Sequence, residues 1–225
     1  SLGAASWKKC RDFEAIDFCE RMKKAGKIRH FGYSFHDEQP LFMEIQAAYD
    51  WEFCQIQYNI LDRGYQAGQA GLEFATGRGT DVIIMEPLRG GNLAGPIPPG
   101  VQKLYDSASS RRSPVDWSLS WIWNRPEAKL ILSGMSTMAQ LEENLAIAGR
   151  ATAESFSPAD LAMMDAVETE YRRLIKVDCT ACRYCMPCPA GVDIPRNFAV
   201  WNTWGMFGES ELARGGYRWI PAAAQ

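Results

Sequence analysis

The residues best suited to chemistry are four cysteines in the segment CTACRYCMPCP, residues 179–189. Each is separated from the next by two residues, and together they are Cys179, Cys182, Cys185 and Cys188. Zinc sites usually pair two C-x₂-C units across a dozen or more residues, a gap that is missing here. Tightly spaced thiolates followed by a proline are typical of bacterial iron–sulfur runs. The spacing therefore favours a 4Fe-4S cluster, with zinc and free thiols as the alternatives.

The last spacer of this run, Met186-Pro187, is one residue shorter than in the bacterial pattern. In that pattern the fourth cysteine often binds another cluster, so Cys188 either completes one cluster or serves a second. Basic residues nearby would offset the negative charge of a cluster, or are ordinary solvated charges; they are Lys176, Arg183 and Arg196.

The other cysteines and the composition bound the class of protein. Cys10, Cys19 and Cys54 lie in apolar settings and are expected to be buried small hydrophobes. This distribution favours a reducing compartment, and hence a cytoplasmic protein.

The formal charge of −3 gives no support for nucleic-acid binding. We see no signal peptide and no apolar run near the roughly 20 residues of a membrane span, so no membrane partner is expected.

Apolar periodicity predicts alternating strands and helices. The predicted strands are residues 28–35, 53–60, 81–88 and 128–134. The predicted helices are residues 13–25, 40–49 and 65–77, one beginning at Ser113-Pro114, one opened by Thr137 and running to about Gly149, and one from Ser157-Pro158 to about Ile175. In the first helix one face carries Phe13, Ile16, Cys19 and Met22. Such alternation indicates parallel βαβ units. Four strands form half of a (β/α)₈ barrel or a small open sheet, because a barrel needs eight.

The composition changes near Val177, where the cysteine run begins. We therefore predict two domains, a barrel-like part at residues 1–176 and an iron–sulfur segment at residues 177–225.

Five stretches carry a resemblance to a known family: GKIRHFGYSFH (26–36), CQIQYN (54–59), MEPLRGG (85–91), LSGMSTMAQLEEN (132–144) and CTACRYCMPCPAGVDIP (179–195). In this order they resemble aldo/keto reductases that carry a C-terminal 4Fe-4S ferredoxin-like extension. The resemblance covers nearly the whole chain, and the cysteine run is its most specific part.

The resemblance implies an α/β fold: the C-terminal half of a (β/α)₈ TIM barrel, strands five to eight, followed by a small ferredoxin-like iron–sulfur segment. The family's catalytic Asp, Tyr, Lys and usual His would then precede Ser1, so no catalytic residue is assigned here. A second cysteine run would follow the last residues. The resemblance therefore describes a fragment truncated at both ends.

The resemblance also implies residues that contact a nicotinamide cofactor, NAD(P)H. Ser34 and Gln55 match the contacts to the carboxamide, and Met85 stands where a tyrosine often stacks on the nicotinamide. Leu88 and Arg89 would line the pyrophosphate. The helix N-terminus formed by Gly134, Met135, Ser136 and Thr137 would bind phosphate. Glu143 and Asn144 match the adenine contacts. Met135 and Gln140 replace the basic residues that hold the 2′-phosphate of NADPH, which favours either NADH or poor discrimination between the two cofactors. Each assignment also has a purely structural alternative. Gln55 could be a buried amide satisfied by the backbone, and residues 134–137 could be a simple capped turn. His36 could be taken for a catalytic base, but a loop residue is preferred.

Two functions follow. The first is an aldo/keto reductase-type oxidoreductase whose partners are a small carbonyl substrate or a redox partner, with this chain alone inactive. The second is a non-catalytic iron–sulfur electron-transfer module on a half-barrel scaffold. Unpaired strand edges also predict poor solubility or dimerisation of the isolated chain.

Overall fold

The computed structural model describes residues 1–225, and the side chains of all of them except Leu212. The chain forms two compact units. The first comprises residues 1–87 and 118–155, and the second comprises residues 88–117 and 156–225. The predicted boundary at residues 176 and 177 lies within the second unit and stays a prediction.

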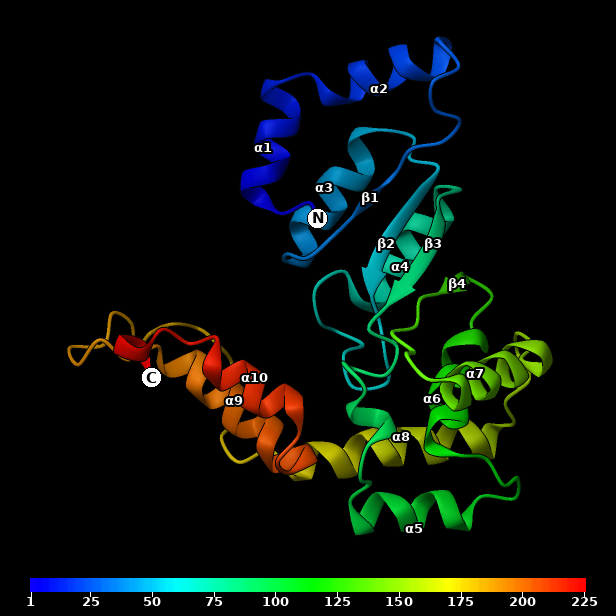
Figure 1. The fold of residues 1–225 in the computed structure, drawn as a ribbon, viewed down its shortest axis with the longest axis vertical. Helices are drawn as coiled ribbons and strands as arrows, with labels where there is room; N and C mark the ends of the chain where they lie inside the picture. The colour runs from blue at the N-terminus through cyan, green and yellow to red at the C-terminus, as the bar shows by residue number, and fades with distance from the viewer. The chain divides into compact units, whose positions relative to one another are not determined.

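The first unit is built on a four-stranded sheet (Figure 1). Its strands are β1 (Tyr33–Ser34), β2 (Phe53–Gln57), β3 (Asp81–Met85) and β4 (Ala128–Ile131). They lie in the order β1-β2-β3-β4, and every neighbouring pair is parallel. This confirms the predicted α/β alternation, although each strand is shorter than the apolar segment that predicted it.

Six helices belong wholly or partly to the first unit. They are α1 (Ala4–Asp12), α2 (Ala15–Lys24), α3 (Gln39–Ala48), α4 (Gly68–Gly77), α6 (Pro114–Trp123), which continues from the second unit, and α7 (Met138–Arg150). The sequence predicted five of these six and missed α1. The helix predicted from residue 13 begins at Ala15 and buries no side chain, and Phe13 is 78% exposed. The apolar face that begins at Phe13 is therefore not a core face.

The two faces of the sheet differ in burial. Cys54, Ile56, Val82 and Ile84 are fully buried. The residues that alternate with them on β2 and β3 are half-buried or exposed, and Gln55 and Met85 are among the half-buried ones. Successive strand residues point to opposite faces, so one face carries the core and the other remains partly open.

A buried polar chain fixes α3 against the core face. The Tyr33 hydroxyl donates to Oε1 of Gln46 at 2.8 Å, and Nε2 of Gln46 donates to the Thr80 hydroxyl at 2.6 Å. The Thr80 hydroxyl in turn donates to the Trp51 carbonyl at 2.9 Å. Each member has a partner, which a buried polar group needs if it is not to destabilise the fold.

The edge of the sheet at β1 is closely packed. A Cβ atom added at Gly32 would lie 2.1 Å from the Phe53 carbonyl oxygen, so only glycine fits there. On the outer side of β1, the Leu2 amide donates to the Ser34 carbonyl at 2.6 Å, and the His36 amide donates to the Leu2 carbonyl at 3.2 Å. Leu2 thus forms a short parallel bridge along this edge.

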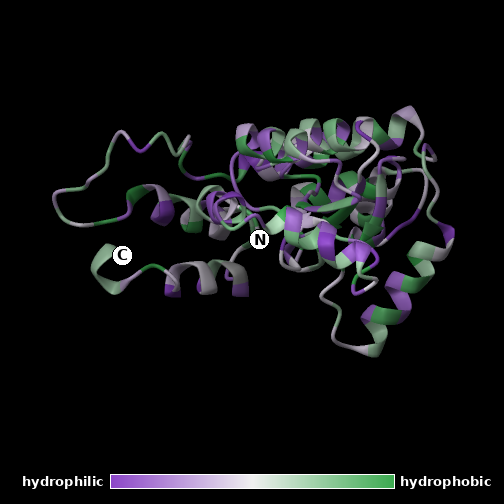
Figure 2. Cartoon of the chain, turned by 90° about the horizontal axis from the view of Figure 1, so that it is seen from above, coloured by the Kyte–Doolittle hydropathy of each residue, from purple (hydrophilic) through white to green (hydrophobic). Residues whose placement is uncertain are grey.

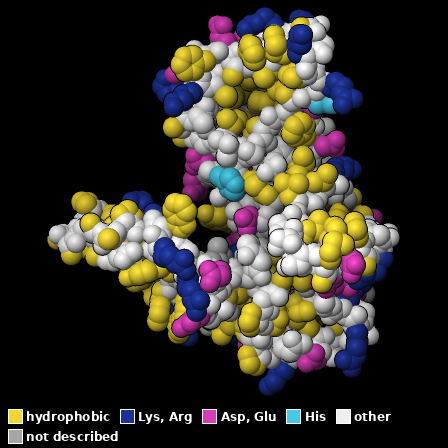
Figure 3. Space-filling model, viewed as in Figure 1, with side chains coloured by type: hydrophobic (Ala, Val, Ile, Leu, Met, Phe, Trp, Pro, Cys, Tyr) yellow, Lys and Arg dark blue, Asp and Glu magenta, His cyan; other side chains and the backbone are white. Residues whose placement is uncertain are grey.

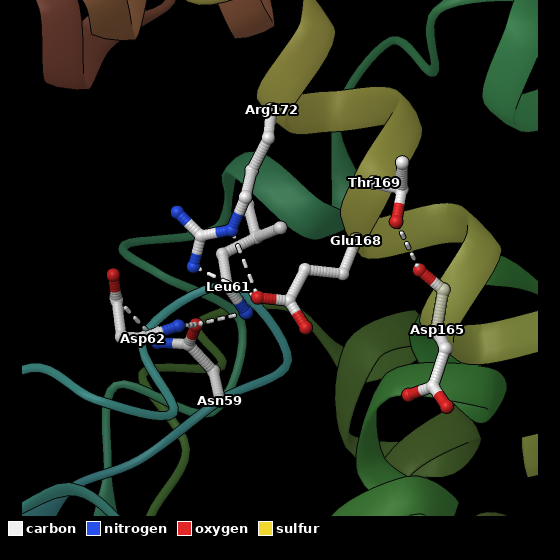
Figure 4. A network of polar contacts seen from close by, with 7 residues as sticks. All are labelled: Asn59, Leu61, Asp62, Asp165, Glu168, Thr169 and Arg172. Carbon is white, nitrogen blue, oxygen red and sulfur yellow. Dashed lines mark hydrogen bonds and ion pairs between the residues drawn. The ribbon is translucent and has the colours of Figure 1, made fainter. Parts of the chain in front are cut away.

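The ends of β2 and β3 are joined by Asn59, which is fully buried. Its Nδ2 donates to Oδ2 of Asp62 at 2.9 Å and to the Glu86 carbonyl at 3.0 Å. Its Oδ1 accepts the amides of Leu61 and Asp62 (Figure 4). This side chain therefore sets the path of the chain where it leaves the sheet.

The second unit is helical. It contains η1 (Asn92–Ala94), α5 (Pro99–Ser107), α8 (Pro158–Arg173), α9 (Ile194–Phe207), α10 (Glu211–Arg218) and η2 (Ala222–Ala224). Only α8 was predicted. It begins as expected at Ser157, whose hydroxyl accepts the Asp160 amide at 3.1 Å. Figure 4 also shows Arg172 donating to Glu168 along this helix, at 2.9 Å. None of the helices in the described part of the chain has the length and apolar content needed to span a bilayer.

Candidate functional site

The carboxyl halves of β1, β2 and β3 carry three side chains that were predicted to hold the nicotinamide, namely Ser34, Gln55 and Met85. Ser34 lies opposite Gln55 in the parallel register. Gln57, two residues after Gln55 on the same face, lies opposite Met85. The Gln55 Nε2 donates to the Met85 Sδ at 3.3 Å. Carboxyl ends of parallel strands are the usual place for ligands in α/β folds.

The side-chain amide of Gln55 could form a stronger hydrogen bond than the one it makes with Met85. The side chain is half-buried, and its amide nitrogen is bonded to a thioether, which is a weak acceptor. The alternative of an amide satisfied by the backbone is not what the structure shows. A carbonyl oxygen of a ligand would be a better acceptor for this N–H group.

The turn after β4 meets its hydrogen-bonding needs with its own side chains. The Met135 amide donates to the Ser133 hydroxyl at 3.2 Å. The amides of Ser136 and Thr137 both donate to Oε1 of Gln140, at 2.9 and 3.2 Å. The predicted capping box is confirmed, since the Thr137 hydroxyl accepts the Gln140 amide at 3.3 Å. A phosphate bound here would have to replace the Gln140 oxygen.

The predicted adenine contacts lie on the second turn of α7. The Asn144 Nδ2 donates to the Ser133 hydroxyl at 2.9 Å and to the Met135 Sδ at 3.4 Å. Glu143 is exposed beside it. Gly134 and the other residues of the turn are exposed as well, so this stretch presents an open surface. Their role in binding stays a prediction.

The remaining two predicted residues, Leu88 and Arg89, belong to the second unit. The Arg89 guanidinium lies 5.5 Å from the centre of the Phe207 ring. Glu86 and Arg89 both have positive φ, 57° and 49°. Backbone strain of this kind in residues other than glycine is concentrated at functional sites. The segment MEPLRGG therefore carries strain where the family resemblance places the pyrophosphate.

The cysteine run forms a loop, and both of its ends are fixed to α9. The Asn202 Oδ1 accepts the amides of Lys176 and Val177 at 3.0 and 2.9 Å, and its Nδ2 donates to the Val177 carbonyl at 2.7 Å. At the other end the Asp193 carboxylate caps α9 by accepting the Arg196 amide at 3.3 Å. Figure 2 shows a long stretch without helix or strand leading into this helix.

Four cysteine thiols are a suitable set of ligands for iron, but the structure does not bring them together into one group. The thiols of Cys179, Cys182 and Cys185 are exposed, Cys188 is half-buried, and all are free. Among the residues that the structure describes, no three His, Cys, Asp or Glu side chains form a group able to hold a metal ion. A hydrogen bond from the Tyr184 backbone, and then one from Thr180, lowers the pKa of Cys182. Thiolate is the form that binds metal.

The structure agrees with some of the expectations for the remaining residues and contradicts one. His36 lies after β1 with its ring nitrogen 3.1 Å from the Gln66 amide oxygen, as expected of a loop residue. Trp117 and Trp121 are buried and pack in the fold. Cys54 is buried, but Cys10 and Cys19 are not, so the prediction that all three are core residues is wrong.

The match to known proteins agrees with this architecture. A profile of the aldo/keto reductase family matches residues 5–169. The chain belongs to the aldo/keto reductase family. The match ends before the cysteine loop.

An individual relative and two solved structures are also similar to this chain. An uncharacterized oxidoreductase of Schizosaccharomyces pombe is 31% identical over 142 residues, which are 62% of this chain and 44% of that protein. The holo form of aldo-keto reductase AKR11C1 from Bacillus halodurans superposes with a TM-score of 0.54 at 20% identity, covering 66% of this chain and 53% of that one. Its apo form gives the same TM-score. The chain spans about half the length of these relatives.

Proposed function

We propose that this chain serves a cytoplasmic, NAD(P)H-dependent oxidoreductase of the aldo/keto reductase type that also carries a 4Fe-4S cluster. The observation that carries the nucleotide part is the grouping of Ser34, Gln55 and Met85 at one end of the parallel sheet. The cluster part rests on four free thiols in a loop whose ends are fixed to α9. When bound, the cluster would take up and release single electrons.

In this proposal the amide of Gln55 and the hydroxyl of Ser34 hold the carboxamide, and the Met85 sulfur contacts the ring. Thr137 and the turn before it hold phosphate, since the first N–H groups of α7 and its dipole favour an anion. Leu88 and Arg89 line the pyrophosphate, and Glu143 and Asn144 contact adenine. Gln140 and Met135 lack the charge that would hold a 2′-phosphate, which favours NADH over NADPH.

We expect the isolated chain not to reduce carbonyl compounds. General acid catalysis needs a donor within hydrogen-bond reach of the carbonyl. The tyrosines nearest the strands do not offer one: Tyr33 and Tyr58 are buried, and burial raises the pKa of both hydroxyls. The check is NAD(P)H oxidation with a panel of aldehydes. Turnover at the roughly 1 to 10³ per second of ordinary enzymes would contradict this expectation.

A second candidate is a non-catalytic electron-transfer module. It is favoured by the location of the cysteine loop in the second unit, while ten of the twelve predicted nucleotide residues lie in the first and only Leu88 and Arg89 lie in the second. Here the first unit is only a scaffold, and the partner is a redox protein rather than a small carbonyl compound.

Anaerobic reconstitution with iron and sulfide tests both candidates. We expect broad visible absorbance that dithionite bleaches and that is lost when Cys182 and Cys185 are replaced by serine. Bleaching by NADH as well supports the oxidoreductase, and bleaching by dithionite alone supports the electron-transfer module. A colourless protein that retains zinc and no acid-labile sulfide rules out both cluster proposals.

A further inference from the structure

Two cysteines outside the loop at residues 179–188 face one cavity in the first unit. Cys10 is on α1 and Cys19 is on α2, and both line a cavity of about 280 Å³. Ser34 lines this cavity too, together with apolar side chains that include Ile16, Phe31 and Trp51. In Figure 3 hydrophobic side chains surround a hollow in the upper part of the molecule, where α1 and α2 lie.

The two thiols lie on helices that follow each other closely in the chain. α1 ends at Asp12 and α2 begins at Ala15, so only two residues join the helices that carry them. Burial raises the pKa of Cys10, and the charge of Cys19 raises it further. Both residues are half-buried and free. They are therefore accessible to a small reagent, unlike Cys54, which is fully buried.

We propose that Cys10 and Cys19 form a redox-active dithiol, which a small disulfide such as oxidised glutathione converts to a Cys10–Cys19 disulfide. A thiolate of the pair attacks one sulfur of the reagent and releases one reduced thiol. The second protein thiol then displaces the other half of the reagent. Two protein thiols and one small disulfide give one protein disulfide and two small thiols, so atoms and electrons balance.

The bridge would tie α1 to α2 across the cavity that Ser34 also lines. In a reducing compartment such a disulfide is transient and serves as a redox sensor. The chemistry of the pair does not depend on the nicotinamide site or on the cluster.

Peptide mapping of the whole protein tests the proposal. The purified protein is equilibrated anaerobically with graded ratios of reduced to oxidised glutathione, alkylated and digested with trypsin. Cleavage after Lys9, Arg11 and Arg21 places Cys10 and Cys19 on separate peptides, apart from those of the 179–188 loop. We expect a linked Cys10–Cys19 peptide whose fraction follows a two-electron titration, while Cys54 stays reduced.

Single variants separate the pair from two unrelated thiols. In Cys10→Ser or Cys19→Ser, the remaining thiol should form a mixed disulfide with glutathione. Mixed disulfides at both residues of the wild-type protein, with no linked peptide at any ratio, would overturn the proposal. Linkage of either residue to the loop cysteines instead would also overturn it.

Discussion

Glu52 is the residue whose protonation state the structure constrains most clearly. Its Oε1 lies 2.6 Å from Lys23 Nζ, and its Oε2 contacts Nδ1 of His30. The hydrogen bond from Lys23, and then that from His30, lowers the pKa of Glu52 to about 2. A carboxylate with a depressed pKa stabilises the folded state fully above its unfolded pKa, which is about 4.3 for glutamate.

This pairing predicts an acid-sensitive contribution to stability. In Glu52→Gln the melting temperature at neutral pH should be lower than in the wild type. The difference should shrink as the pH falls from about 4.3 towards 2, because the wild-type carboxylate then becomes protonated. Glu142→Gln, at an exposed position on α7, is the control and should follow the wild type. A difference that does not change with pH would show that Glu52 acts without its charge.

At the scale of an element, the start of α7 is predicted to serve both stability and nucleotide binding. Thr137→Ala removes the cap and frays the first turn, which costs about 1 kcal/mol of stability. Ser157→Ala removes the matching cap of α8 at a similar cost. We expect only Thr137→Ala to weaken NADH binding, measured by the change in NADH fluorescence. Equal weakening in both variants would place the nucleotide elsewhere.

The attachment of the cysteine loop to α9 gives a second prediction at this scale. Asn202→Ala removes three hydrogen bonds that hold Lys176 and Val177. We expect the reconstituted variant to lose iron to a chelator several-fold faster, since residues that fix metal ligands commonly affect metal affinity by about 10–100-fold. Thr203→Ala, one residue along the same helix, is the control, because its hydroxyl bonds only within the helix. Equal loss rates in both variants would contradict a positioning role.

At the scale of the whole molecule, the open sheet predicts self-association. No strand of the described residues pairs with the outer edge of β4, and Leu130 and Leu132 beside it are 47% and 39% exposed. Unpaired apolar edges favour pairing with another chain. Leu130→Lys should shift the protein towards monomer in sedimentation velocity. Leu161→Lys, which changes an exposed leucine on α8, should not; a wild-type monomer at all concentrations would exclude this association.

Several features of the fold follow from local sequence. The alternation of β-rich apolar runs with amphipathic stretches predicted four parallel strands, and Ser157 and Thr137 marked helix starts correctly. The helices α1, α5, α9 and α10 were missed. In α9 the apolar residues include Trp201 and Trp204, which are 49% and 39% exposed, so no clear inward face appears in the sequence.

The sequence by itself determined the strand and helix order, the family and the cysteine spacing, because these depend on residue types at short range. Only the tertiary structure decided that Ser34, Gln55 and Met85 meet, that Gln140 occupies the N–H groups of its own turn, and that Cys10 and Cys19 face one cavity. Those neighbours are set by strand register and by how crossover helices pack. Both depend on contacts between residues far apart in the chain, which periodicity cannot specify.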